Sequence, residues 1–305
     1  MPWERTSLTD LNDWTKEDFR CFLSLGLAHK ASLSHRARKQ EILRGRTVVN
    51  LFFEPSTRTR ISFEIAEQFL GADVVNWSSS GSSLSKGETL RDTVWTLKAM
   101  GVDALVVRHS MAGFPLFLQK LLPGVAVING GDGARSHPTQ ALLDLLSAYE
   151  ALGDLEGVPM VIVGDVRHSR VARCVAKAFT SMGASVFFAG PRSLMPANVE
   201  ALGGTYVEDS RQALRISKIV YLLRIQRERQ DQGLFPSFRE YHRFFGADPD
   251  ELRDDALVMH PGPINRGVEI SSSVADGPQS LILDQVRSGV AARMAVLELC
   301  LGGER

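Results

Sequence analysis

The sequence is short of cysteine and carries no excess charge of either sign. Its three cysteines, Cys21, Cys174 and Cys300, are too few and too far apart for a disulfide framework or a metal cluster, and they suit a reducing compartment. Basic and acidic side chains number 35 each, so the formal net charge is zero. A general binder of nucleic acid or of acidic membranes has a basic excess, so neither kind of partner is predicted.

Long apolar runs and the common cofactor motifs are also missing. No stretch approaches the roughly 20 apolar residues of a membrane-spanning helix, and the polar segment 1–19 lacks the apolar core of a signal peptide. The absence of G-x-x-x-x-G-K-[ST] and of a complete G-x-G-x-x-G leaves ATP or dinucleotide binding unsupported. The absence of H-E-x-x-H, C-x-x-C and G-x-S-x-G argues against a metal site and a serine hydrolase. We therefore expect a cytoplasmic protein that uses no metal and no cofactor.

Apolar runs of strand length alternate with amphipathic runs of helix length through the first half of the chain. Helical patterns cover residues 9–27 and 29–43 before the alternation begins. Strands are then predicted at 48–53, 73–77, 104–108 and 125–129, and helices at 61–70, 88–100 and 114–121. Strands that alternate with helices pair in parallel through right-handed crossovers. The first half of the chain is therefore predicted to form an α/β domain.

One long helix, predicted over residues 138–152, precedes a second alternation of the same kind. Strands are predicted at 159–164, 185–189, 205–207 and 219–223, and helical segments at 169–182, 199–202 and 282–301. A chain of 305 residues is long enough for two domains. We predict an α/β fold with domains at 1–145 and 146–281, each a mainly parallel sheet flanked by helices. The long helix is shared, and the last helix returns to the first domain.

The most distinctive stretch is the predicted turn from the first strand into its helix, Ser56-Thr57-Arg58-Thr59-Arg60. The first N–H groups of a helix have no partner within the helix, and the helix dipole is positive there. Hydroxyl groups add further donors, and guanidinium groups add planar forks that suit phosphate. A capped helix start with solvated arginines is the plain alternative. Five consecutive donor side chains favour a phosphate-binding site.

Further polar clusters stand at predicted strand or helix ends, where open α/β sheets place their ligands. They are Arg108-His109-Ser110, Ser136 to Gln140, Gly164 to Arg170, Arg224 to Arg229 and the stiff turn His260-Pro261-Gly262-Pro263. Each alone has a plain structural explanation, as a helix cap or a solvated arginine. The serine- and glycine-rich segment 77–88 is either a surface loop or a mobile loop that carries one lysine to an anion. Together the clusters favour electrostatic stabilisation of an anionic substrate without a covalent intermediate.

Over essentially its whole length the chain resembles the aspartate/ornithine carbamoyltransferase family. The resemblance rests on Phe53 to Arg60, Ser82 with Lys86-Gly87-Glu88, Arg108-His109, His137 to Asp144, Gly164-Asp165 with Arg170, Arg224-Ile225-Gln226 and His260 to Pro263. It implies an enzyme that transfers the carbamoyl group of carbamoyl phosphate to an amino acid. It also implies a homotrimer whose active sites are shared between subunits.

The resemblance implies a role for each matching residue. Carbamoyl phosphate would be bound by Ser56, Thr57, Arg58, Thr59, Ser82, Lys86, Arg108, His137, Gln140, Gly262 and Pro263. Catalytic roles would fall to Arg58, Thr59, Lys86, Arg108 and His137, and aspartate would be bound by Lys86, Arg170, Arg224 and Gln226. Ser82 and Lys86 would enter from a neighbouring subunit. His137 would act as a neutral donor to the carbonyl oxygen, because an imidazolium beside several arginines is unfavourable.

The acceptor amino acid is predicted from two details. Ornithine-specific members of the family typically carry cysteine in a late H-C-L-P turn, whereas this turn reads His260-Pro261-Gly262-Pro263. Arg224 and Gln226 also suit a second carboxylate better than an ammonium group. The sequence therefore predicts N-carbamoyl-L-aspartate as the product, as in the second step of pyrimidine synthesis.

Some alternatives stay open at this level. An ornithine carbamoyltransferase, or one for another amino acid, is the nearest competitor, and a non-catalytic scaffold of the same family is the competitor from another class. Some family members have leucine where Gly262 stands, and relatives occur in assemblies with dihydroorotase or with a regulatory chain. Arg60 is expected to support the site indirectly by pairing with a carboxylate such as Glu88.

Overall fold

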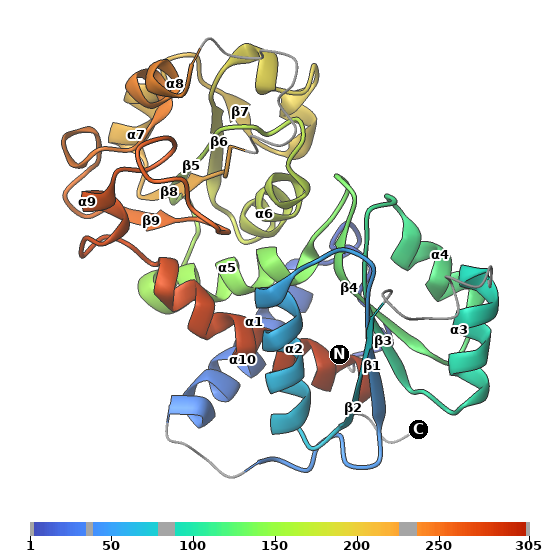
Figure 1. Cartoon of the computed structure of the whole chain (residues 1–305). Coiled ribbons are helices and arrows are strands. Elements are labelled where there is room, and N and C mark those ends of the chain that lie inside the picture. The colour runs from blue at the N-terminus through green and yellow to red at the C-terminus, as the bar shows by residue number, and fades with distance from the viewer. Residues whose placement is uncertain (1–2, 35–38, 79–88, 226–236, 303–305) are drawn as a thin grey trace. The chain divides into compact units, whose positions relative to one another are not determined.

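Two separate parallel sheets organise the chain, which is described in a computed structural model over residues 3–34, 39–78, 89–225 and 237–302 (Figure 1). Contacts divide the chain into unit 1, residues 1–139 with 288–305, and unit 2, residues 140–287. The first division falls inside α5 (Pro138–Leu152) and the second inside α10 (Ile282–Leu301). Among the described residues, no helix is both long and apolar enough to cross a membrane.

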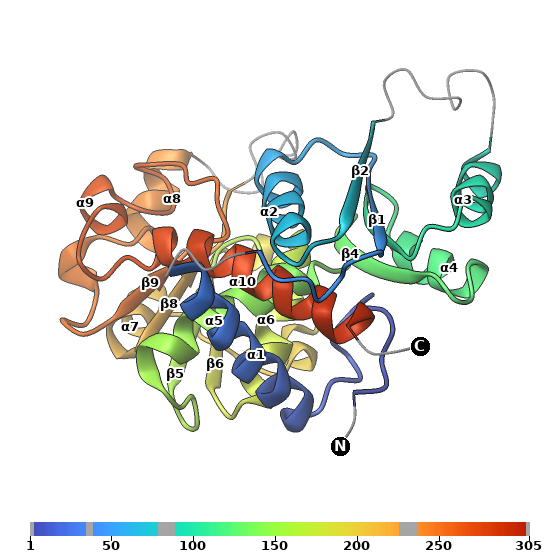
Figure 2. The same ribbon diagram turned by 90° about the horizontal axis from the view of Figure 1, so that it is seen from below.

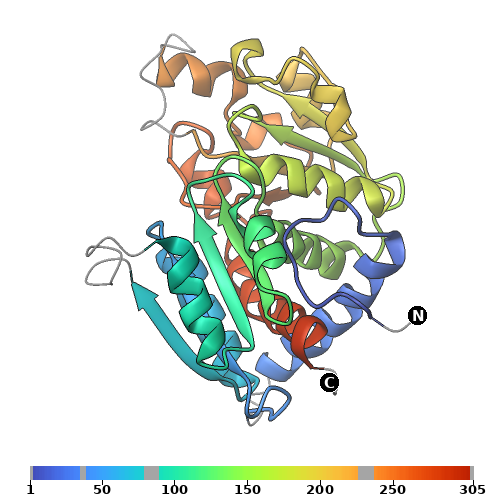
Figure 3. The same ribbon diagram turned by 90° about the vertical axis from the view of Figure 1, so that its right-hand side faces the viewer.

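Unit 1 has a four-stranded sheet with helices on both faces. Its strands are β1 (Thr47–Phe52), β2 (Asp73–Ser78), β3 (Ala104–His109) and β4 (Ala126–Asp132). Besides the parts of α5 and α10 that belong to this unit, its helices are α1 (Lys16–Ser34), α2 (Thr57–Phe69), α3 (Leu90–Ala99) and α4 (Phe114–Leu121). The view in Figure 2 separates α2 on one face of the sheet from α3 and α4 on the other. The strand order is β2-β1-β3-β4, and every pairing is parallel, so the strands point the same way in Figure 3.

The alternation of side chains along β1 explains how both faces are covered. Val49 and Leu51 belong to an apolar cluster with residues of α3 and α4. Between them, Asn50 points to the opposite face and donates a hydrogen bond of 2.8 Å from Nδ2 to Oε2 of Glu67 on α2. Both partners are fully buried. Burial raises the pKa of the Glu67 carboxyl to about 8, and Glu64 adds to the rise.

We expect this carboxyl group to make stability depend on pH. Its pKa is higher in the folded than in the unfolded chain, so stability falls as pH rises from about 4.5 to about 8. The total loss is a few kcal/mol, since one pKa unit corresponds to about 1.4 kcal/mol. Glu67→Gln keeps an acceptor for Asn50 but cannot ionise. Thermal midpoints at pH 6 and pH 9 should therefore differ less in Glu67→Gln than in the wild type.

The control is the same substitution at Glu17, whose side chain is 77% exposed on α1. Glu17→Gln should keep the pH response of the wild type. An unchanged pH response in Glu67→Gln would show that the Glu67 carboxyl does not ionise over this range.

Unit 2 contains five parallel strands in the order β7-β6-β5-β8-β9. They are β5 (Pro159–Val163), β6 (Ser185–Ala189), β7 (Thr205–Tyr206), β8 (Ile219–Leu222) and β9 (Leu257–Met259). The helices are α6 (Arg170–Ser181), α7 (Ser210–Ile216), α8 (Phe238–Phe245) and α9 (Ser272–Ala275), with 3₁₀ turns η2 (Arg192–Leu194), η3 (Val199–Leu202) and η5 (Pro249–Glu251). Alternate residues of β5 and β8 form an apolar core with α7 and α9. The observed fold therefore confirms the predicted class, with two parallel α/β sheets flanked by helices.

Two predicted helices near the N-terminus are wrong in extent. The first begins at Lys16 instead of residue 9, because Leu8 joins the sheet beside β4, with its N–H donating to the Val127 carbonyl. The helix continues to Ser34, but residues 39–43 of the predicted helix 29–43 are not helical, and a turn covers residues 42–45. There the Gln40 N–H donates to the Phe69 carbonyl, which ties the segment to the end of α2.

Candidate active site

Several of the predicted binding residues lie at the ends of the strands between which the strand order of each sheet reverses. In unit 1, the connection from β1 leads to β2 on one side and the connection from β3 leads to β4 on the other, so the strand order reverses between β1 and β3. In unit 2, the connections from β5 to β6 and from β8 to β9 likewise lead to opposite sides, so the order reverses between β5 and β8. Ligands of open α/β sheets bind at the carboxyl ends of the strands at such a switch point. Ser56 to Arg60 lie just after β1 and Arg108 lies near the end of β3, while Arg170 and Arg224 lie in the segments after β5 and β8.

The start of α2 differs from the starts of five other helices, α3, α6, α7, α8 and α9. The side chains of Thr89, Ser169, Asp209, Ser237 and Ser271 each accept a hydrogen bond from an N–H of the helix that they cap. Ser56 is the N-cap of α2, but its hydroxyl makes no such bond. The first N–H groups of α2 are thus not satisfied by the cap side chain, as a helix start that binds an anion requires.

The side chains of this first turn are accessible to a ligand to different degrees. Thr57 and Arg58 are exposed, Ser56 is half-buried, and Thr59 is buried. Arg60 is also exposed, while Glu88, its predicted partner, lies outside the described residues. The turn therefore presents hydroxyl and guanidinium groups at the carboxyl end of β1.

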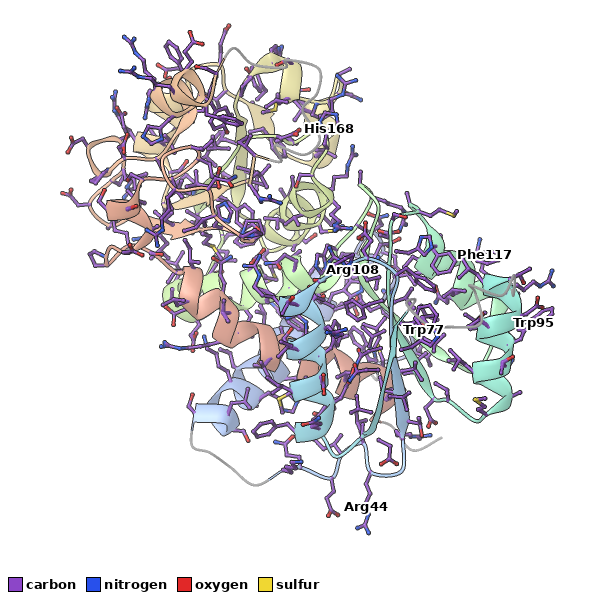
Figure 4. The ribbon with its side chains drawn as sticks, in the orientation of Figure 1. Arg44, Trp77, Trp95, Arg108, Phe117 and His168 are labelled. Carbon is purple, nitrogen blue, oxygen red and sulfur yellow. The ribbon has the colours of Figure 1, made fainter. Side chains whose placement is uncertain are left out.

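Arg108 is held at the same end of the sheet, on the neighbouring strand β3 (Figure 4). Its backbone carbonyl accepts from the Phe53 N–H at 2.9 Å. Its guanidinium donates from Nη1 to the Gly130 carbonyl at 3.1 Å and lies 3.4 Å from Oε2 of Glu54. The side chain is only 12% exposed. Two fixed partners hold the plane of the guanidinium, which is the preorganisation that recognition of a phosphate or carbonyl oxygen needs.

His109, which follows Arg108, packs in an aromatic cluster. Its ring contacts Phe53 and Phe114, with centroid separations of 4.9 and 4.2 Å. Its Nδ1 accepts from the Met111 N–H at 2.8 Å. Burial lowers the pKa of this imidazole, against a smaller opposing effect of Glu54. The ring is therefore neutral and part of an aromatic cluster.

His137 is buried immediately before α5, at the end of a well-held loop. The Asp132 N–H donates to the Ser136 carbonyl at 3.0 Å, which forms an antiparallel bridge. Arg135 forms ion pairs with Asp132 and with Asp10. This loop places the imidazole of His137 at the beginning of the long helix.

Gln140 is oriented by a buried carboxylate that sequence reasoning did not assign to the site. Its Nε2 donates to Oδ1 of Asp144 at 2.9 Å, one turn further along α5. Asp144 also accepts from the Tyr221 hydroxyl at 2.6 Å and from Nε2 of Gln285 at 2.7 Å. Burial, then the Asp144 carboxylate, raises the pKa of Tyr221 well above its usual value. Because the amide nitrogen of Gln140 is a donor to Asp144, its carbonyl oxygen is the group that can accept from a substrate N–H.

The two predicted aspartate-binding arginines stand after adjacent strands of unit 2. Arg170 is the first residue of α6, and Arg224 follows β8 by two residues; both are half-buried. Gly164 lets these strand ends approach, since a Cβ there would lie 3.1 Å from Cβ of Leu223 and 3.2 Å from the Tyr241 hydroxyl. Its φ of +127° is also one that other residues rarely adopt.

The late turn adopts a conformation that suits glycine. Gly262 has φ of +63°, in the left-handed region, and the Gly262–Pro263 peptide bond is cis. The Gly262 N–H donates to Nδ1 of His260 at 2.7 Å. At this φ a leucine side chain would be strained, so the glycine fits the turn as it stands.

Three of the predicted site residues, Ser82, Lys86 and Gln226, lie outside the described residues. Within the ranges that the structure describes, no group of three or more His, Cys, Asp or Glu side chains could hold a metal ion.

Comparison with known families identifies the family to which the chain belongs. Residues 6–150 match the carbamoyl-P binding domain of the aspartate/ornithine carbamoyltransferases, and residues 156–300 match their Asp/Orn binding domain. The chain belongs to this family. The aspartate carbamoyltransferase catalytic subunit of Opitutus terrae is 48% identical over 307 residues, which cover 100% of this chain and 98% of the relative. That of Pelotomaculum thermopropionicum is 50% identical over 299 residues, covering 97% and 96%.

Solved structures of the family share the fold. The ornithine carbamoyltransferase from Pyrococcus furiosus has a TM-score of 0.87 at 30% identity, with 100% of both chains covered. Aspartate transcarbamoylase from Trypanosoma cruzi in complex with carbamoyl phosphate and aspartate has a TM-score of 0.85 at 28% identity, with 99% of both chains covered. Because carbamoyltransferases named for either amino acid share this backbone, the acceptor has to be inferred from side chains.

Proposed function

We propose that the protein is an aspartate carbamoyltransferase, which converts carbamoyl phosphate and L-aspartate into N-carbamoyl-L-aspartate and phosphate in pyrimidine synthesis. The observation that carries the proposal is the placement of Arg170 and Arg224 after the adjacent strands β5 and β8. Two guanidinium groups at one switch point suit an acceptor with two carboxylates, whereas the side-chain ammonium of ornithine would be repelled. Relatives about half identical in sequence carry the same name, which supports the assignment.

The proposed chemistry is electrostatic positioning of an acyl phosphate. The first turn of α2, with Ser56, Thr57, Arg58 and Thr59, binds the phosphate together with Arg108. Arg108, Thr59 and neutral His137 donate to the carbonyl oxygen, where negative charge develops as the aspartate amine attacks. The carbonyl of Gln140 and the backbone at Gly262 and Pro263 accept from the carbamoyl amide. The new C–N bond forms, the C–O bond to phosphate breaks, and the phosphate leaves with its charge stabilised and accepts the proton that the amine loses.

A colorimetric assay for carbamoylated amino acids tests the function. The protein is incubated with carbamoyl phosphate and either aspartate or ornithine, and a reaction without carbamoyl phosphate is the control. We expect product with aspartate and none above the control with ornithine. Product with ornithine would contradict the acceptor assignment, and no product with either amino acid would identify a non-catalytic relative.

We also propose a cytoplasmic homotrimer in which Ser82 and Lys86 complete the active site of a neighbouring subunit. The resemblance to the family supports this arrangement. Unit 1 also exposes large apolar side chains on α3 and α4, where Trp95 is 43% and Phe117 is 51% exposed (Figure 4). Exposed apolar groups on neighbouring helices suit a surface that another subunit covers.

Mixing two inactive variants tests whether sites are shared. Lys86→Ala and Arg58→Ala subunits are each expected to be inactive, because each lacks a cation of the phosphate site. In a mixed trimer with shared sites, one site of three combines an intact Arg58 with an intact Lys86. Random exchange should therefore restore about a quarter of wild-type activity. Two separately prepared Lys86→Ala samples are the control, and no recovery after demonstrated exchange would contradict shared sites.

A further inference from the structure

A buried histidine in unit 2 links the late turn to a buried carboxylate. His260 is 2% exposed, and Glu269 is 1% exposed. Nδ1 of His260 accepts from the Gly262 N–H at 2.7 Å, so the proton of the neutral ring is on Nε2. Nε2 lies 3.2 Å from Oε1 of Glu269 and donates to it. The carboxylate thus selects the tautomer in which the other ring nitrogen can hold the Gly262 amide.

The same carboxylate orders the segment that carries Arg224. Oε1 of Glu269 accepts from the Asn265 N–H at 2.5 Å, and Oε2 accepts from Nδ2 of Asn265 at 3.2 Å. Nδ2 of Asn265 also donates to the Ile225 carbonyl at 3.0 Å. Ile225 is fully buried and packs with Tyr241 and Val268. The residue next to Arg224 is therefore fixed both by an apolar cluster and by a hydrogen bond that depends on Glu269.

A third connection leads from His260 to Gln140. The His260 N–H donates to Oε1 of Gln285 at 3.0 Å. Nε2 of Gln285 donates to Asp144, the carboxylate that orients Gln140. All of these residues belong to unit 2. Three proposed substrate-binding elements, namely Gln140, the late turn and the Arg224 segment, are thus attached to one buried polar network.

We propose that His260, Glu269 and Asn265 are positioning residues for the two substrates. His260 positions the backbone of the late turn to bind the carbamoyl group, and Asn265 positions the segment that carries Arg224 to bind aspartate. Glu269 accepts hydrogen bonds from both residues. The inference rests on the proposed function, which assigns the late turn and Arg224 to the substrates. Hydrogen bonds to a charged group are stronger than neutral ones, and small misplacements of binding groups reduce rates strongly.

Two substitutions at His260 separate its two hydrogen bonds. The side-chain oxygen of asparagine can replace Nδ1 as the acceptor for Gly262, and the amide nitrogen of glutamine can replace Nε2 as the donor to Glu269. We expect His260→Gln to raise the KM for carbamoyl phosphate about tenfold to a hundredfold, because the Gly262 N–H loses its acceptor. His260→Asn should keep that KM within about threefold of the wild type.

Asn265→Ala tests the aspartate side of the network. It removes the bonds to Ile225 and to Oε2 of Glu269, so we expect the KM for aspartate to rise about tenfold. The dissociation constant of carbamoyl phosphate, measured by calorimetry, should stay within about threefold of the wild type. Asn198→Ala is the matched control, since Asn198 is exposed in unit 2 and makes no side-chain cap bond. It should change neither constant.

The outcomes separate this inference from the proposed function. If the wild type makes no carbamoylaspartate, the function and the inference both fail. If the wild type is active but His260→Asn and His260→Gln lose equal activity, His260 has a merely structural role and the inference alone is overturned. If His260→Gln fails to fold, the Asn265→Ala variant tests the inference instead. An unchanged KM for aspartate in Asn265→Ala would overturn the positioning role.

Discussion

Arg108→Ala is expected to lower kcat by about a thousandfold, corresponding to about 4 kcal/mol of transition-state stabilisation. In the proposed reaction this guanidinium donates both to the leaving phosphate and to the carbonyl oxygen. It is held by Glu54 and by the Gly130 carbonyl, so it needs little reorganisation as charge develops. Steady-state kinetics with saturating carbamoyl phosphate and aspartate would measure the loss.

Arg108→Lys should recover part of the lost activity, because lysine keeps the positive charge but cannot form the bidentate hydrogen bonds by which a guanidinium binds two oxygens. Arg44→Ala is the matched control. Arg44 precedes β1, at the amino end of the strands, and its side chain is 76% exposed (Figure 4). Thermal midpoints would show whether Glu54, left without Arg108, destabilises the fold. A kcat within tenfold of the wild type in folded Arg108→Ala would contradict the proposed role.

Arg224→Ala is expected to raise the KM for aspartate about a hundredfold, because a carboxylate loses a paired guanidinium, worth about 3 kcal/mol. The dissociation constant of carbamoyl phosphate should change much less, since Arg224 is proposed to bind the acceptor only. Initial rates at varied aspartate, together with calorimetry on carbamoyl phosphate, separate the two effects.

Arg215→Ala serves as the control in unit 2. Arg215 is 61% exposed and pairs with Glu251 at 2.9 Å, an exposed ion pair of little energetic weight. Its loss should leave both constants unchanged. A normal KM for aspartate in Arg224→Ala would overturn the assignment of Arg224 to the acceptor, and equal losses for both substrates would indicate general disruption of the segment after β8.

The sequence predicted the strands β1 to β8 because most of them are short runs of mainly apolar residues. In β1 and β4 nearly every residue is buried, and both contain short apolar runs, with Val48, Val49, Leu51 and Phe52 in β1 and Ala126 to Ile128 in β4. The sequence did not predict β9 or α9, which have three and four residues and are too short to show a period. It also did not predict α7 and α8, whose seven and eight residues give about two helical turns each.

The candidate site was predictable where its residues stand next to each other in the chain. Ser56 to Arg60 lie next to each other, Arg108 lies near the end of a strand that periodicity locates, and Arg170 and Arg224 follow two other such strands. Asp144 belongs to a recognisable motif with Gln140, but its other partners are 77 and 141 residues away. No local pattern connects positions so distant, so the buried network that orients Gln140 and the late turn required the folded chain.

The amino-acid sequence alone determined the parallel α/β class and the resemblance to the carbamoyltransferases, and it predicted a phosphate-binding turn, because periodicity and motifs are local properties of the chain. Only the tertiary structure decided which strands neighbour each other, and so which arginines share a switch point. It also decided that His109 packs in an aromatic cluster while His260 links the late turn to Glu269. These roles depend on partners brought together by packing, and the chemical type of a residue does not specify its partners.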